Sequence, residues 1–170
     1  MAEETIQMVT EQNERLSKLV RTLLDMSELQ TVSRNDRIEL HSLIEEVLTD
    51  LEPLAQEKKV ELIQKSQGAG AKEDEELFLT GSDILIYRML YNLVENAIKY
   101  NRENGSVTVS AIREKNEVVL TVSDTGNGID EAFREQIFEP FFRVDKSRSR
   151  ELGGVGLGLA MVRELSLIHI

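Results

Sequence analysis

Three short motifs stand in a fixed order in the second half of this chain, and they restrict its fold more than any other feature. The first is Asn92-Leu-Val-Glu-Asn-Ala-Ile-Lys-Tyr100, the second is Asp124-Thr-Gly-Asn-Gly-Ile129, and the third is Gly153-Gly-Val-Gly-Leu-Gly-Leu-Ala160. They predict a helix with amides and an ammonium on one face, a carboxylate at the end of a strand, and a glycine-rich loop before a helix. A fold that brings these three parts together would form a nucleotide pocket.

The first motif predicts a polar helix face. Its polar side chains recur every three or four residues and therefore share that face; they are Asn92, Asn96, Lys99 and Tyr100. Asparagine is a poor helix former, so its presence within a helix needs a reason, and an amide oxygen is a hard ligand suited to Mg²⁺. Lys99 could meet phosphate charge, Tyr100 could flank the base or the ribose, and Glu95 on the neighbouring face could orient a metal-bound water. The alternative is that these residues only form the solvated face of the helix.

The second motif places Asp124 at the end of an apolar strand, where a side chain emerges from the core at the edge of the sheet. A carboxylate in that position can accept a hydrogen bond from the amino group of adenine. Gly126 and Gly128 have no Cβ atom, so the backbone can turn tightly there and approach a base. The alternative is a simple hairpin turn, which uses the same residue types.

The third motif is a glycine-rich loop that leads into a predicted helix from about Leu157. Its spacing matches neither the dinucleotide-binding fingerprint nor the P-loop, but it offers backbone N–H groups to an anion at a helix N-terminus. A basic polar segment over residues 143–150 precedes it and includes Lys146. We predict that this segment is a mobile lid that closes on a triphosphate, with a solvated charged loop as the alternative.

Hydrophobic periodicity predicts the elements around these motifs. Residues 5–30 form an amphipathic helix whose apolar stripe needs a partner helix or else lies on its own domain, and a linker over 31–36 follows. Strands are predicted over 37–40, 59–65, 77–80, 106–113 and 117–123, and helices from Ser42, over 84–100 and near 131–137. Because strands and helices are interspersed without a regular βαβ period, we predict an α+β fold, a two-layer α/β sandwich.

Two local signals bear on the helix that is predicted from Ser42. Ser42-Leu-Ile-Glu45 fits a capping box, so the helix should begin there. Pro53 should kink or end it, because proline has no N–H to donate and its ring clashes with the preceding turn.

Composition argues against several classes of partner. The formal net charge of −11 disfavours binding to nucleic acid or to an anionic membrane surface. Without cysteine, the chain can form neither disulfides nor thiolate metal sites, which fits a reducing cytoplasm. No run of about 18 apolar residues occurs, so we expect no membrane contact by this chain.

Together with the aromatic segment Phe138-Glu-Pro-Phe-Phe142, the motifs resemble the catalytic, ATP-binding domain of bacterial sensor histidine kinases. That domain belongs to a superfamily shared with DNA gyrase, heat-shock chaperone and mismatch-repair ATPases. The matching segments are an asparagine box at 92–100, glycine boxes at 124–129 and 153–160, and a phenylalanine box at 138–142. The resemblance covers roughly residues 5–164, and its first helix is similar to the second helix of the family's dimerisation and phosphotransfer hairpin. It implies a Bergerat-type fold, a mixed sheet covered by helices, that binds ATP and Mg²⁺.

The resemblance also implies roles for single residues. Asn96 would hold Mg²⁺, Asp124 would recognise adenine, and Lys99 with the second glycine box would hold phosphates. The catalytic candidates are Asn92, Glu95, Asn96 and Lys99. The nucleotide-binding candidates are Asn96, Lys99, Tyr100, Asp124, Gly126, Gly128, Ile129, Phe138, Arg143, Lys146, Gly154, Val155, Gly156, Leu157, Gly158 and Leu159.

The family further implies two partners. The γ-phosphate of ATP passes to a histidine on the dimerisation hairpin of the parent kinase and then to an aspartate on the receiver domain of a response regulator. The parent would be a homodimer that is anchored in a membrane, with this domain on the cytoplasmic side. Two alternatives stay open: a regulatory module that binds ATP without transferring phosphate, and a serine kinase or other ATPase of the same superfamily.

Both ends of the sequence suggest a fragment. Residues 1–32 are predicted to be a remnant of the hairpin, and residues 33–164 to be the ATP-binding domain without its last two strands. Neither His41 nor His169 occupies the position of the phosphate-accepting histidine, so we expect the acceptor to be missing. Residues 165–170 can be back-translated into the end sequence of a transposon adapter used in DNA sequencing, so we predict an adapter-derived tail.

Overall fold

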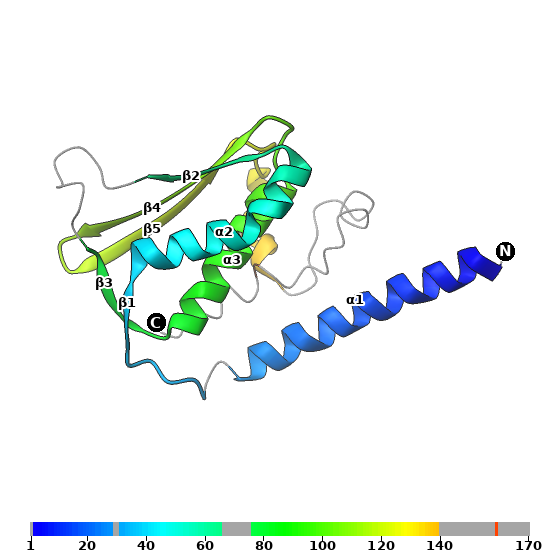
Figure 1. Ribbon diagram of the computed structural model, residues 1–170, viewed down its shortest axis with the longest axis horizontal. Coiled ribbons are helices and arrows are strands. Elements are labelled where there is room, and N and C mark those ends of the chain that lie inside the picture. Colours follow the sequence, from blue (N-terminus) through cyan, green and yellow to red (C-terminus); the bar gives the residue numbers. More distant parts are fainter. Residues whose placement is uncertain (1, 29–30, 66–75, 140–158, 160–170) are drawn as a thin grey trace.

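The computed structural model describes residues 2–28, 31–65, 76–139 and 159, and Figure 1 shows the helices and strands that these ranges contain. In chain order the elements are α1 (Ala2–Glu28), β1 (Asp36–Glu39), α2 (Leu40–Lys58), β2 (Glu61–Lys65), β3 (Phe78–Gly81), α3 (Asp83–Lys99), β4 (Ser106–Glu114), β5 (Glu117–Asp124) and two short 3₁₀ turns, η1 (Glu131–Phe133) and η2 (Gln136–Phe138). The helices and strands predicted before residue 124 are all present, with bounds that shift by a few residues.

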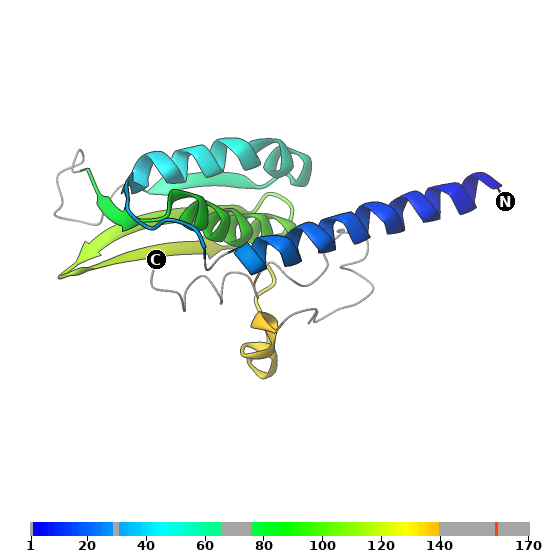
Figure 2. The same ribbon diagram turned by 90° about the horizontal axis from the view of Figure 1, so that it is seen from below.

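Helix α1 projects away from the rest of the molecule, as Figures 1 and 2 show. Its apolar stripe is exposed: the exposed fractions of Ile6, Val9 and Leu16 are 65%, 61% and 58%. The stripe therefore does not lie on its own domain, and a partner helix stays the prediction for this face. Within the described ranges, no helix combines the length and the apolar character that a membrane span requires.

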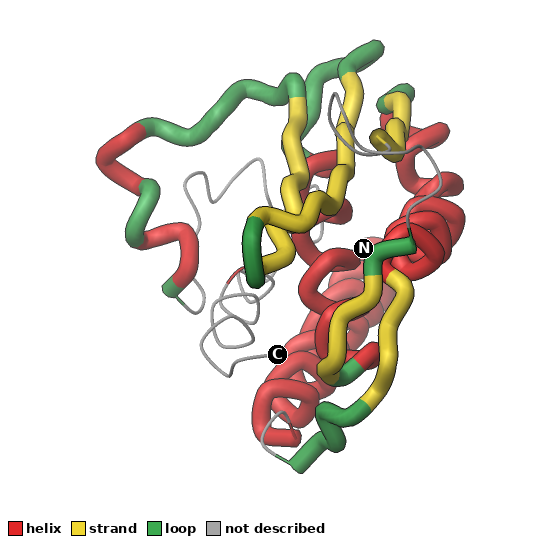
Figure 3. Tube along the Cα trace, turned by 90° about the vertical axis from the view of Figure 1, so that its left-hand side faces the viewer, coloured by secondary structure: helices red, strands yellow, loops and turns green. Residues whose placement is uncertain are grey.

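The strands form two separate sheets, which are visible as two groups in Figure 3. In the larger sheet, β4 lies in the middle, with β2 parallel to it on one side and β5 antiparallel on the other. Strands β1 and β3 form an antiparallel pair in which Glu39 faces Phe78. Arg113 of β4 donates a hydrogen bond to the carbonyl of Phe78 at 2.9 Å and so joins the two sheets.

Helices α2 and α3 lie side by side over one face of the larger sheet, and the hydrophobic core fills the space between these layers (Figure 2). Along β4 the side chains alternate, so that Val107, Val109 and Ala111 are fully buried. They share a core with Ile44 of α2 and Leu90 of α3. Full burial of one Leu, Ile or Val side chain stabilises a fold by about 1.5–3 kcal/mol. This arrangement confirms the predicted α+β sandwich with a mixed sheet.

Helix α2 begins two residues before Ser42, so the predicted capping box is wrong. Glu39 is the N-cap instead, and its carboxylate accepts hydrogen bonds from the N–H groups of His41 at 3.2 Å, Ser42 at 2.7 Å and Leu77 at 3.2 Å. A carboxylate at this place satisfies backbone donors that a capping serine would otherwise serve. Partial burial alone would raise the pKa of the Glu39 carboxyl, but these hydrogen bonds outweigh burial and hold that pKa below its ordinary value.

Pro53 lies inside α2, which continues to Lys58, so the prediction that this proline ends the helix is also wrong. Proline removes one backbone hydrogen bond. The buried side chains of Leu51 and Ala55 on either side hold the flanking turns against the core. The helix ends at Lys59, whose left-handed backbone, with φ 54°, is a common way to close a helix.

The short helix predicted near 131–137 is instead two separate 3₁₀ turns, η1 and η2. Asp130 caps the first turn by accepting a hydrogen bond from the N–H of Ala132 at 3.0 Å. Neither turn has a buried side chain, so packing does not stabilise a longer helix here. In Figures 2 and 3 this segment leads away from the sheet.

Candidate nucleotide-binding site

Helix α3 carries the first motif and turns its apolar face to the core. Ser82 caps its start, since the hydroxyl accepts a hydrogen bond from the N–H of Leu85 at 3.4 Å. Leu90 and Val94 are fully buried, so residues about half a turn away from them face outward. The helix ends at its C-cap, Tyr100. The polar residues of the motif therefore lie on the outer side of a helix that is fixed along its length.

The two asparagines of α3 have different surroundings. Asn92 donates from Nδ2 to the carbonyl of Arg88, one turn earlier, at 2.7 Å, so its amide is bound to its own helix. The side chain of Asn96 is half-buried and makes no hydrogen bond to any residue that the structure describes. Its amide oxygen is therefore free to bind a cation or a water. Of the two, Asn96 is the better candidate for a ligand of Mg²⁺.

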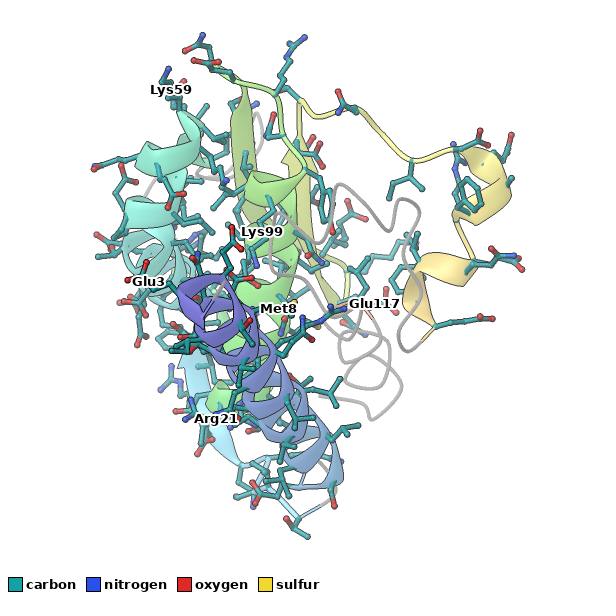
Figure 4. The ribbon with its side chains drawn as sticks, turned by 90° about the vertical axis from the view of Figure 1, so that its right-hand side faces the viewer. Glu3, Met8, Arg21, Lys59, Lys99 and Glu117 are labelled. Atoms are coloured by element: carbon teal, nitrogen blue, oxygen red, sulfur yellow. The ribbon has the colours of Figure 1, made fainter. Side chains whose placement is uncertain are left out.

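Lys99 and Glu95 form an ion pair one helical turn apart, with Nζ 2.9 Å from Oε1. The two side chains are only 12% and 20% exposed. Figure 4 shows Lys99 toward the end of α3. The sequence suggested that Lys99 meets phosphate and Glu95 orients a water, whereas in this structure each is the partner of the other. A phosphate group that binds Lys99 would compete with the Glu95 carboxylate.

Asp124 is the last residue of β5, as the sequence predicted. Leu120 and Val122 of the same strand pack against the core, so alternation turns the Asp124 side chain toward the layer of the helices. One carboxylate oxygen, Oδ1, accepts a hydrogen bond from the N–H of Gly126 at 2.8 Å. The other oxygen, Oδ2, takes no hydrogen bond from the part of the chain that the structure describes. An adenine amino group could donate to Oδ2 without disturbing the turn.

Gly126 lies directly against the end of α3. A Cβ atom at this position would stand 2.6 Å from the carbonyl oxygen of Tyr100 and 2.8 Å from Oδ1 of Asp124. The sequence suggested that a glycine was needed here so that a base could approach, but the chain itself occupies this space. At Gly128 the backbone has φ +69°, which favours glycine, and a Cβ atom would meet nothing within 4 Å. Ile129 is 47% exposed and follows directly.

Sequence reasoning missed three residues that link these two parts of the site. Thr125, inside the second motif, donates from Oγ1 to Oδ1 of Asn101 at 3.1 Å and accepts from the N–H of Ser106 at 2.9 Å. Asn101 directly follows the first motif. The residue types could have indicated this link from the sequence, because asparagine and threonine side chains commonly form hydrogen bonds to nearby backbone groups in turns.

A second missed contact lies between α2 and α3. The hydroxyl of Tyr87 donates a hydrogen bond to the carboxylate of Asp50, and the ring stacks on Tyr91 with centroids 5.9 Å apart. Burial first, and the nearby carboxylates second, raise the pKa of both tyrosine hydroxyls above the ordinary value. Both groups therefore stay protonated near neutral pH, and the contact serves to join the two helices.

The remaining candidates are only partly described. Phe138 is the last residue of η2 and is half-buried, and Leu159 is helical and half-buried. The other candidates of the lid and of the second glycine box lie outside the described residues; they are Arg143, Lys146, Gly154, Val155, Gly156, Leu157 and Gly158. The site that the structure does describe is thus the contact between the end of α3 and the turn after β5.

This contact supplies a distinct set of groups. It offers an amide oxygen at Asn96 that has no partner among the described residues, an ammonium at Lys99, a carboxylate oxygen at Asp124, and the side chains of Tyr100 and Ile129, which are 50% and 47% exposed. Among the described residues, no group of three or more His, Cys, Asp or Glu residues could hold a metal ion. The amide oxygen of Asn96 would suit Mg²⁺ bound with a nucleoside triphosphate, since that ion takes few protein ligands and keeps waters and phosphates among the others.

Comparison with known proteins identifies the family to which this chain belongs. The family model for histidine kinase-, DNA gyrase B- and HSP90-like ATPases matches residues 81–169, just over half of the chain. The sensor histidine kinase RppB of Synechocystis sp. is 33% identical over 164 residues, which are 95% of this chain and 35% of that protein. The sensor histidine kinase WalK of Bacillus subtilis is 34% identical over 167 residues, 95% of this chain and 26% of that protein. The chain thus spans about a third or less of the length of these relatives.

Solved structures agree in fold. The catalytic domain of the histidine kinase ThkA superposes with a TM-score of 0.65 at 27% identity, over 78% of this chain and 80% of that one. Full-length ShkA in complex with AMPPNP gives a TM-score of 0.73 at 25% identity, over 97% of this chain and 33% of that one. The chain therefore belongs to the family of histidine kinase-, DNA gyrase B- and HSP90-like ATPases, and within it to the ATP-binding catalytic domains of sensor histidine kinases.

Proposed function

We propose that the contact between α3 and the turn after β5 binds ATP with Mg²⁺, and that the γ-phosphate passes to a histidine on a helical hairpin. One observation carries this proposal: Asn96 presents a half-buried amide with no partner among the described residues, one turn from the Lys99 ammonium. Asparagine is a poor helix former, and this amide, in the last turn of α3, is available to a ligand.

Two solved relatives support this function. ShkA was solved in complex with AMPPNP, and the histidine kinase ThkA was solved in complex with the response regulator protein TrrA. We infer that this chain likewise binds an adenine nucleotide, and that the kinase of which it forms part phosphorylates a response regulator. We also propose that this kinase acts as a homodimer, with the ATP-binding domain on the cytoplasmic side of a membrane.

In this proposal, different residues bind different parts of the nucleotide. Asp124 accepts the adenine amino group on Oδ2, while Oδ1 stays bound to its own turn. Lys99 leaves Glu95 for the phosphates, and Glu95 is then free to accept a hydrogen bond from a water beside Asn96. Asn96 would hold Mg²⁺, which when bound would offset negative charge on the phosphate oxygens.

In the transfer step, the phosphoryl group moves from an oxygen of ATP to a nitrogen of the acceptor histidine. The bond from the γ-phosphorus to the bridging oxygen breaks, ADP leaves, and a bond forms to a ring nitrogen of the acceptor histidine. The cationic groups of the site offset the negative charge that shifts to the bridging oxygen. The phosphoryl group would then move from the histidine to a receiver-domain aspartate.

The first experiment measures ATP binding by titration calorimetry with the whole chain, with Mg²⁺ and then with excess chelator. We expect Mg²⁺-dependent binding that Asn96→Ala weakens by about tenfold or more, since groups that hold a metal typically contribute that much to affinity. Asn13→Ala is the matched control, because Asn13 is also an asparagine within a helix but lies on α1. Equal affinity in the wild type and Asn96→Ala would contradict the role of Asn96.

The second experiment separates a kinase from a regulatory module that only binds ATP. The chain is incubated with ATP labelled at the γ-phosphate and with a separately purified dimerisation hairpin that carries its histidine. Acid-labile label on the hairpin, absent with Asn96→Ala and with a hairpin whose histidine is replaced by alanine, would support the kinase. Normal ATP binding without label on the hairpin would instead favour the regulatory module.

A further inference from the structure

The side chains of Asn101 and Thr125 form a polar link between the end of α3 and the turn after β5. The Thr125 hydroxyl donates to Oδ1 of Asn101 at 3.1 Å and accepts from the N–H of Ser106 at 2.9 Å. Nδ2 of Asn101 in turn donates to the carbonyl of Ser106 at 3.0 Å. The N–H of Thr125 donates to the same carbonyl at 3.2 Å. One hydroxyl and one amide therefore tie three parts of the chain together.

Two glycines leave no free space around this link. A Cβ atom at Gly105 would stand 2.2 Å from Oδ1 of Asn101 and 2.6 Å from Oγ1 of Thr125. A Cβ atom at Gly126 would stand 2.6 Å from the carbonyl oxygen of Tyr100. The backbones of the α3 end and of the turn are therefore in direct contact, and the link fixes how one lies on the other.

The orientation of Asp124 depends on this contact. Its side chain is exposed, and among the described residues its carboxylate accepts one hydrogen bond, from the N–H of Gly126 in its own turn. The pairing of β5 with β4, in which Asp124 faces Val107, places the backbone of Asp124. The side chain of Thr125, the next residue, bonds the turn that carries this carboxylate to Asn101 at the end of α3.

We propose that Thr125 and Asn101 are positioning residues for the recognition of adenine by Asp124, without touching the nucleotide themselves. This inference rests on the proposed function, because it assumes that Asp124 accepts the amino group of adenine. A shift of the turn by a few tenths of an ångström would lengthen that hydrogen bond while leaving the phosphate contacts of α3 in place. Loss of the link should therefore weaken the binding of nucleotides that carry the amino group more than that of nucleotides that lack it.

The test compares ATP with purine riboside triphosphate, which lacks the 6-amino group, on the same preparation of the whole chain. For the wild type we expect ATP to bind about tenfold more tightly, since one hydrogen bond to a charged group is worth roughly that factor. Thr125→Val, which keeps the shape and deletes the hydroxyl, should reduce this ratio to about two. Thr125→Ser, which keeps the hydroxyl, should restore the ratio.

Two further variants test whether the change in the ratio is specific to the link between Asn101 and Thr125. Thr121→Val is the matched control, because Thr121 is an exposed threonine of β5, the strand that precedes Thr125, and it should keep the wild-type ratio. Asn101→Ala removes the acceptor from the other side of the link, so it should lower the ratio as Thr125→Val does. Because each ratio comes from one preparation, a fraction of unfolded protein affects both nucleotides equally and cancels.

The outcomes separate the two proposals. If the wild type binds neither nucleotide, or binds both equally, the proposed recognition of adenine by Asp124 fails. If the wild type discriminates and Thr125→Val and Asn101→Ala discriminate equally well, the positioning role fails while the function stands. If Thr125→Val weakens both nucleotides by the same factor, Thr125 has a structural role only, and the inference is overturned.

Discussion

Helices α1 and α3 are both amphipathic, yet α3 has its apolar face in the core and α1 has its apolar face in solvent. In α3, Leu90 and Val94 are fully buried, whereas Leu16 and Leu24 of α1 are 58% and 57% exposed. The two helices differ in connectivity: strands of the sheets stand close to both ends of α3, while residues 31–35, which form neither helix nor strand, precede β1 on the side of α1. An apolar stripe therefore predicts that a helix packs against some surface, but it does not say whether that surface belongs to the same domain.

The largest expected effect tests this difference directly. Leu90→Ala should lower the free energy of unfolding by about 2–5 kcal/mol, because it leaves a cavity in the core. Leu16→Ala should change it by less than about 0.5 kcal/mol, because the side chain is already exposed. Both are measured by urea unfolding followed by tyrosine fluorescence. The chain has three tyrosines and no tryptophan, and the tyrosines lie on α3 or at its C-cap, so this signal reports the domain alone.

An equal loss of stability in the two variants would contradict the comparison, since it would mean that α1 is packed as firmly as α3. Circular dichroism at a helix-sensitive wavelength sharpens the result, because it also detects α1. A transition seen by circular dichroism but not by tyrosine fluorescence would show that α1 unfolds independently of the domain.

The same comparison explains how much of the fold could be predicted from the sequence. Periodicity predicted α1, α3 and the β4–β5 hairpin well, because each is a local pattern of a single element. The start of α2 was wrong because its cap depends on Leu77, a residue far along the chain, which also donates to the Glu39 carboxylate. Pro53 does not end α2, because burial of its neighbours, a tertiary effect, outweighs the local preference of proline.

In the candidate site, too, local features could be predicted from the sequence, whereas a contact between distant parts of the chain could not. The place of Asp124 at the end of a strand followed from the sequence, because an apolar strand and a motif stand next to each other. The link between Asn101 and Thr125 could not be predicted, because it depends on the register between β4 and β5, in which Val107 faces Asp124. The ion pair of Glu95 with Lys99 had a local signal, since the two are four residues apart, but the functional interpretation of each residue concealed it.

The N-terminus of α2 offers a second, smaller test of how a helix is fixed within the domain. Glu39→Gln should lower the free energy of unfolding by about 1 kcal/mol at pH 7, since a cap contributes roughly that amount. The folded-state pKa of Glu39 lies below its ordinary value, so the carboxylate stabilises the fold above that ordinary value, near 4.5. The difference from the wild type should then shrink as the pH falls below about 4.5 and through the folded-state pKa.

Glu45→Gln is the control for the cap, because Glu45 is an exposed glutamate of the same helix. It should have little effect at any pH. A difference between Glu39→Gln and the wild type that stays constant from pH 7 to pH 3 would show that the carboxylate charge of Glu39 does not contribute to the cap.

The last comparison separates two lysine–glutamate pairs at the ends of α2 and α3, and it includes the smallest expected effect. Glu95→Gln leaves the Lys99 ammonium, only 12% exposed, without its carboxylate, and we expect a loss of about 1 kcal/mol. Glu103→Gln breaks the pair with Lys59. The side chains of Lys59 and Glu103 are 65% and 63% exposed, so we expect no measurable shift of the unfolding midpoint. Added salt should narrow the gap between Glu95→Gln and the wild type only slightly, because the shielded pair is screened less than an exposed one. If both variants unfold at the wild-type midpoint, the Glu95–Lys99 pair adds nothing to stability, and Lys99 can move to a phosphate without any loss to the fold.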